Sequence, residues 1–118
     1  MDIKKTLSDV VSGTGEAGKT VVSVSGEIVK QGEATVGDLI HVAFEIAKET
    51  GKDTEELIKD VVVGAVKAAA ETTTAGEEGT TAIIVEAEKA AGEITEEGGE
   101  DVRKGIDEAK KILKEPLK

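Results

Sequence analysis

Apolar and small residues recur at every eleventh position along much of this chain. In rows of eleven from Val10, the first column reads Val10, Val21, Gly32 and Ala43, and three further columns follow the same pattern. Eleven residues span three turns of an α-helix, so each column forms a nearly straight stripe along one helix face. The pattern restarts at Val61 and is clearest in the row IIVEAEKAAGE. It predicts an all-α fold.

A longer repeat divides the chain into two related halves, about 1–50 and 54–118. The segment LSDVVSG at 7–13 returns as IKDVVVG at 58–64, and GKTVVSVSGE at 18–27 is loosely repeated as GTTAIIVEAE at 79–88. Between the halves, Gly51 suits a helix C-cap, and Asp53 with Glu56 suits the capping box of the next helix. We expect the clearest helix boundary here and weaker breaks at 31–37, 72–81 and 95–99.

The glycine content limits the length of the helices. The chain has 14 glycines, and each would cost a helix interior about 1 kcal/mol relative to alanine. A single uninterrupted rod is therefore excluded, and the glycines are expected either to end helices or to let two helices touch closely. Together these features predict one domain, residues 1–118, built as a small antiparallel bundle or as helical hairpins of about four or five helices.

A β-sheet is the alternative fold. The segments TVVSVSGEIV and TTAIIVEA are rich in β-branched residues, which suit strands. The alternation that a half-buried strand requires breaks at Val21-Val22 and at Ile83-Ile84-Val85, whereas the eleven-residue columns run through both segments. The pattern therefore favours helices.

The composition excludes several classes of function. The core of this 118-residue chain must be made from Val, Ile, Leu and Ala, because Phe44 is the single aromatic residue and there is no cysteine. A net charge of -10 argues against binding nucleic acid or an anionic membrane through general electrostatics. We find no apolar run long enough for a signal peptide or a transmembrane segment, and we expect a cytoplasmic protein.

One stretch matches a known ligand-binding motif. GTGEAGKT, from Gly13 to Thr20, fits the pattern G-x-x-x-x-G-K-[ST], and over these eight residues it resembles P-loop nucleotide-binding proteins. The resemblance implies a loop whose backbone amides surround the phosphates. Its candidate cofactor-binding residues are Gly13, Gly18, Lys19 and Thr20.

The neighbouring sequence does not support this motif. A P-loop follows a buried strand, but TLSDVVS offers only two adjacent valines where a continuous apolar run is expected. The related segment IKDVVVG opens onto AVKAAAE, which strongly favours a helix. We therefore expect a helix before Gly13, a chance match to the motif, and no cofactor, with nucleotide binding kept as an alternative.

Other candidate chemistry is sparse. His41 is the single histidine, which excludes a multi-histidine metal site or a histidine-based triad within one chain. Glu86, Glu93 and Glu97 have a spacing that would align them on one helix face, and we interpret them as a solvated face. The stretch EEGGED, from Glu96 to Asp101, is interpreted as an acidic turn. We predict no metal site and no catalytic residues.

These observations favour a non-enzymatic helical structural or protein-interaction protein. Its narrow stripes predict self-association as a homodimer, with an unknown protein as another possible partner. Val24 and Ile28 are the proposed contact positions. Val24→Asp should dissociate or unfold the protein, whereas Lys30→Asp should be tolerated. In addition, the row IIVEAEKAAGE resembles the eleven-residue units of late-embryogenesis-abundant proteins and also resembles helical proteins that coat lipid or polymer granules. The second resemblance implies a further alternative, an amphipathic coat protein on a neutral hydrophobic surface.

Overall fold

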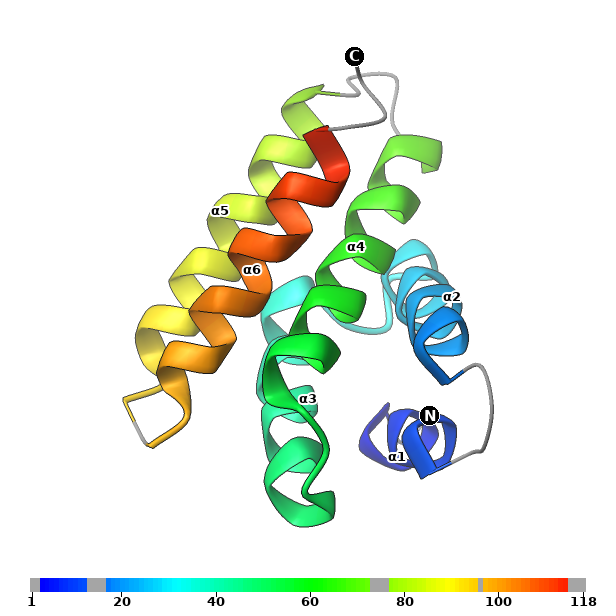
Figure 1. Cartoon of the computed structure of the whole chain (residues 1–118). Helices are drawn as coiled ribbons and strands as arrows, with labels where there is room; N and C mark the ends of the chain where they lie inside the picture. The colour runs from blue at the N-terminus through cyan, green and yellow to red at the C-terminus, as the bar shows by residue number, and fades with distance from the viewer. Residues whose placement is uncertain (1–2, 13–16, 73–76, 96, 115–118) are drawn as a thin grey trace.

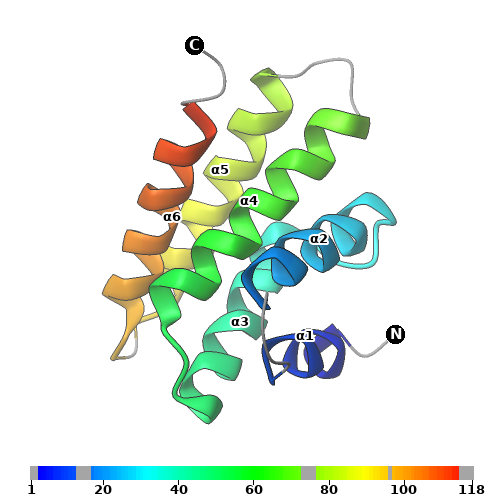
Figure 2. The ribbon, with the colours of Figure 1, turned by 45° about the vertical axis from the view of Figure 1, so that its right-hand side comes forward.

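Six helices make up the described part of the chain. The computed structural model describes residues 3–12, 17–72, 77–95 and 97–114, and at several helix ends that border the gaps it describes the backbone only. The helices are α1 (Ile3–Ser12), α2 (Ala17–Lys30), α3 (Val36–Thr50), α4 (Thr54–Thr72), α5 (Glu77–Glu93) and α6 (Gly99–Lys114). They pack against one another as Figures 1 and 2 show. This arrangement confirms the predicted all-α fold.

The two segments considered as strands lie in helices. TVVSVSGEIV belongs to α2 and TTAIIVEA to α5. The number of helices exceeds the predicted four or five because α1 and α2 are separate elements on either side of residues 13–16, which lie outside the described residues. Two of those four residues are glycines, which have a low helix propensity.

Helix α4 is the centre of the molecule. It contacts α2, α3, α5 and α6, and its contact with α2 is the most extensive between any two helices. Its stretch Val61–Val66 is buried at every position, which is typical of a helix surrounded by other helices. In Figure 1, α4 and α6 run in the same direction, whereas α3 and α5 run in the opposite direction.

Glycines allow the closest contacts of α4. A Cβ atom at Gly64 would overlap the backbone carbonyl oxygen of Val22 on α2. On the other side of α4, a Cβ atom at Gly105 of α6 would lie 2.6 Å from the carbonyl oxygen of Glu55 and 2.8 Å from Cβ of Ile58. The prediction that some glycines bring helices together is therefore confirmed at both contacts.

The boundary between α3 and α4 has the predicted caps. Gly51 adopts a left-handed conformation with φ 75°, and its N–H donates to the carbonyl oxygen of Ala47 at 2.9 Å. The backbone N–H of Glu56 donates to Oδ1 of Asp53 at 3.3 Å, as expected for an N-cap. The Glu56 carboxylate accepts a hydrogen bond from Nζ of Lys59 at 2.7 Å. Of the predicted capping box, the described residues thus show the half that Asp53 provides. The predicted helix boundary at 50–54 is thus confirmed.

A capping box that the sequence analysis did not identify begins α3. The hydroxyl of Thr35 accepts a hydrogen bond from the backbone N–H of Asp38, and the Asp38 carboxylate accepts one from the backbone N–H of Thr35, both at 3.2 Å. The turn that follows α2 contains Gly32, which has φ 73°. The expected break at 31–37 therefore separates α2 from α3.

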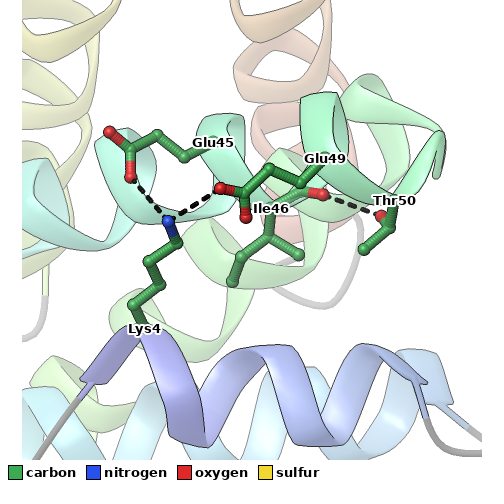
Figure 3. A network of polar contacts seen from close by, with 5 residues as sticks. All are labelled: Lys4, Glu45, Ile46, Glu49 and Thr50. Carbon is green, nitrogen blue, oxygen red and sulfur yellow. Dashed lines mark hydrogen bonds and ion pairs between the residues drawn. The ribbon is translucent and has the colours of Figure 1, made fainter.

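Helix α1 packs at the edge of the fold beside α2 and α3. Leu7 and Val11 bury its apolar face in the common core. On its polar face, the ammonium group of Lys4 lies 2.9 Å from Oε1 of Glu49 and 3.4 Å from Oε2 of Glu45, as Figure 3 shows. In the same view, the Thr50 hydroxyl donates to the carbonyl oxygen of Ile46 at 2.7 Å, within the last turn of α3.

The stripe positions proposed for a dimer contact pack within their own chain. Ile28 is buried in the core, and Val24 is half-buried against it. A charge at Val24 would therefore test folding more directly than association. The surface available to a second chain must be sought on another face.

Candidate interaction surface

The P-loop-like segment borders the first gap in the described residues. Gly13 lies outside the described residues, whereas Gly18, Lys19 and Thr20 form part of the first turn of α2, with their side chains also outside that description. The residues before Gly13 form helix α1, as expected, in the position where a P-loop has a strand. The expectation that no nucleotide binds at this segment stays a prediction, which a titration can test.

His41 lies on the surface between α3 and α5. Its Nε2 atom is 3.1 Å from Oε1 of Glu93, and both side chains are about half exposed or more. An exposed pair of this kind contributes about 0–1 kcal/mol to stability. His41 therefore lies at the edge of the buried face of α3, next to the buried Ile40.

The three glutamates predicted to share a helix face do not all lie on one helix. Helix α5 ends at Glu93, so Glu97 belongs to the turn before α6, where it is exposed. Glu86 is half-buried near Gly37 of α3. The prediction of one aligned face was wrong because α5 ends at Glu93, before Glu97. Within residues 3–12, 17–72, 77–95 and 97–114, no three His, Asp or Glu side chains gather as a metal-binding group.

Helix α5 carries an apolar residue that points away from the core. Val85 is 58% exposed, while Ala87, Ala90 and Ala91 of the same helix are buried. The exposed residues nearest to Val85 along this side are small or singly charged. We call this side the outer face of α5 and define it by Ala82, Val85, Lys89 and Gly92.

The spacing of these residues makes the outer face continuous. Positions 82, 85, 89 and 92 are three, four and three residues apart, so they lie in a row along one side of an α-helix. A Cβ atom at Gly92 would meet no atom within 4 Å, which leaves open space above it. Another helix could therefore approach the backbone of α5 closely along this row.

Sequence reasoning placed Val85 in an apolar segment but did not predict its exposure. The signal was present, because three consecutive apolar residues, Ile83-Ile84-Val85, cannot all face one core from a helix. Ile83 and Ile84 are half-buried and Val85 faces outward. Ile112, at the end of α6, is the second large apolar side chain that the structure describes as exposed, at 38%.

An ion pair joins α6 to α5. Nζ of Lys110 on α6 lies 3.0 Å from Oε2 of Glu88, one residue before Lys89 of the outer face. This pair leaves Lys89 as the basic residue in the middle of the outer face, which is otherwise small and apolar. The outer face of α5 is the best candidate for contact with another protein.

Comparison of this chain with protein-family models, with curated proteins and with solved structures finds no match. Among the helices that the structure describes, none has both the length and the apolar character that crossing a bilayer requires.

Proposed function

We propose that this protein is a non-enzymatic helical interaction protein that associates with a second copy of itself through the outer face of α5. The observation that carries the proposal is the 58% exposure of Val85 in a row that also holds Ala82, Lys89 and Gly92. A cytoplasmic location is part of the same proposal and rests on composition.

A two-fold arrangement suits this face. In a symmetric dimer, the same patch serves both chains, so a valine in the centre meets its own copy. Ala82 and Gly92 on either side allow the two helices to approach closely. Helix α5 has 17 residues and is therefore about 25 Å long. One face of a helix of this length buries less area than the roughly 800 Å² per partner that is typical of a stable interface. The proposed dimer is consequently weak.

The proposed dimer should tighten when salt is added. Each chain carries a net charge of -10, so two copies repel each other at low ionic strength, and screening reduces that repulsion. A basic protein partner would show the opposite dependence, because salt would weaken its attraction to this chain. Raising sodium chloride from about 0.05 to 0.5 M, over which the Debye length shortens several-fold, distinguishes the two partners.

Sedimentation equilibrium of full-length protein over about 10 µM to 1 mM tests the proposal. We expect the wild type to approach twice the monomer mass of 12.2 kDa at the upper concentrations. Val85→Glu should stay monomeric because its carboxylate, together with the ammonium group of Lys89 one turn later, would have to be taken out of water in the contact. Ile112→Glu is the matched control, since it changes an exposed apolar residue on another helix and should dimerise like the wild type. A wild type that stays monomeric throughout, or an equal effect of the two variants, would contradict the proposal.

A nucleotide is not the expected ligand. Isothermal titration with Mg·ATP and Mg·GTP should give no dissociation constant of about 1 mM or tighter. The physical reason is the helix, α1, in the place where a phosphate-binding loop follows a strand. Saturable binding that Lys19→Ala abolishes would instead establish the P-loop function.

A further inference from the structure

A cavity of about 230 Å³ lies between α1, α2 and the first turns of α4. Its walls are apolar and belong to the core, since Val11, Val21 and Leu57 are all less than 8% exposed. Three charged residues, Lys52, Asp53 and Glu56, lie at its exposed rim. At roughly 30 Å³ for each group of water size, the cavity holds about eight such groups.

An unusual side chain completes the lining. Asp60, one turn after Glu56 on α4, is only 8% exposed. Among the residues that the structure describes, none forms a hydrogen bond or an ion pair with the Asp60 carboxylate. The charged groups that influence it are Lys59 and Glu56. Nζ of Lys59 is itself engaged by the Glu56 carboxylate at 2.7 Å. Asp60 is thus a buried acid that opens onto a cavity and has no partner there.

The surroundings of Asp60 penalise its charge. Burial raises the pKa of this carboxyl from 3.8 to about 6; the positive charge of Lys59 opposes this effect, and the negative charge of Glu56 adds to it. At pH 7 the group is therefore ionised in an apolar environment, which costs free energy unless a cation pairs with it. A cation bound beside Asp60 would remove that cost.

We propose that this cavity binds a small organic cation, a primary alkylammonium ion, with its ammonium group at Asp60 and its hydrocarbon chain against Val11, Val21 and Leu57. The apolar walls give the hydrocarbon a place out of water. A divalent metal ion is disfavoured, because it needs several oxygen ligands, and among the described residues the inner wall offers one carboxylate, that of Asp60.

The rim and the whole molecule favour a positive ligand. Asp53 and Glu56 outnumber Lys52 at the rim, and the chain has a net charge of -10. Such a potential concentrates cations near an opening and repels anions. This inference does not depend on the outer face of α5 or on self-association.

The experiment is an NMR titration of the full chain at pH 7 with n-pentylammonium chloride, followed through the methyl groups of Val11, Val21 and Leu57 and the carboxyl carbon of Asp60. We expect saturable shifts with a dissociation constant on the order of 1 mM. The pKa of Asp60 should fall by about one unit or more when the cation is bound, because an opposite charge favours the ionised form. Pentanol and pentanoate, which match the probe in size, should bind at least about tenfold more weakly.

Asp60→Asn is the test variant, because it keeps the shape of the side chain and removes its charge. It should lose binding of n-pentylammonium by about tenfold or more, with an unchanged circular dichroism spectrum as the check on folding. Asp107→Asn, at an exposed position of α6 far along the chain, should bind like the wild type. Should Asp60→Asn fail to fold, the displacement of the Asp60 pKa in the wild type decides the question. Equal binding of pentanol, retained binding by a folded Asp60→Asn, or an Asp60 pKa that the amine does not move would overturn the proposal.

Discussion

A single missing side chain at Gly64 sets the distance between α4 and α2. Its helical backbone has an ordinary conformation, so the need for glycine comes from the neighbouring Val22 carbonyl and not from φ. Ser25 of α2 lies in the same contact, where its fully buried hydroxyl has no hydrogen-bond partner among the described residues. The close contact of these two helices therefore buries a hydroxyl group without a hydrogen bond, which lowers stability.

Alanine substitutions at two helical glycines should act in opposite directions. Gly64→Ala should lower the free energy of unfolding by about 2–3 kcal/mol, because its Cβ atom meets backbone that cannot move without separating the helices. Gly92→Ala should raise it by about 0.5–1 kcal/mol, because the site is open and alanine has the higher helix propensity. Urea unfolding at a few micromolar measures both, and a stabilising Gly64→Ala would show that the contact is looser than described.

The charge of Asp60 should make stability depend on pH. The pKa of the folded state, about 6, lies above the ordinary value of 3.8, so the folded protein holds the proton more tightly than the unfolded chain. Protonated Asp60 therefore adds roughly 2–3 kcal/mol to the free energy of unfolding below about pH 4. This stabilisation decreases as the pH rises and is lost above about pH 6.

Asp60→Asn should remove the pH dependence of stability that the Asp60 carboxyl causes. At pH 7 the variant should be more stable than the wild type, and at pH 4 the two should differ little. The comparison uses urea midpoints at both pH values, with Asp107→Asn as the exposed control. A variant that is less stable than the wild type at pH 7 would mean that the Asp60 carboxylate has a stabilising partner.

At the scale of the helices, the sequence allowed us to predict where helices end more reliably than how they pack. The boundary at Gly51 and Asp53 was predictable because a left-handed glycine and a capping aspartate act on their own neighbours. The central position of α4 was not, since the apolar stretch around Val61 fits a buried helix in any topology. The same holds for the candidate surface and the cavity: the exposure of Val85 and the burial of Asp60 depend on which helices pack beside them.

The cap at Asp53 should contribute measurably to stability. Asp53→Ala removes the acceptor of the Glu56 backbone N–H and should lower the free energy of unfolding by about 0.5–2 kcal/mol. Lys52→Ala, at the exposed neighbouring position, should change it by less than about 0.5 kcal/mol. An unchanged urea midpoint for Asp53→Ala would show that solvent caps this helix equally well.

At the scale of the whole molecule, the two halves of the chain do not stand apart. Each half holds three helices, but α2 and α3 of the first half both pack on α4 of the second. Val21 and Ile28 of α2 would be exposed without the second half of the core. The boundary at 50–54 is therefore a boundary between helices, and the apolar core crosses it.

A fragment of residues 1–53 should consequently not fold alone. We expect little helical signal and no cooperative unfolding by circular dichroism, because its apolar residues lack the surface of α4. Mixing it with a fragment of residues 54–118 should give more helical signal than the sum of the two. Cooperative unfolding of the first fragment by itself would contradict this expectation.

The position of α4 also affects the chain while it is being synthesised. Residues 54–72 leave the ribosome after α1, α2 and α3, and at roughly 5–20 residues per second their 19 positions take about one to four seconds to appear. During that interval the valines and isoleucines of α2 and α3 have no helix to cover them, so they are available to chaperones and to other nascent chains. A codon change that slows translation between residues 54 and 72 should therefore lower the yield of folded protein, although it alters no amino acid.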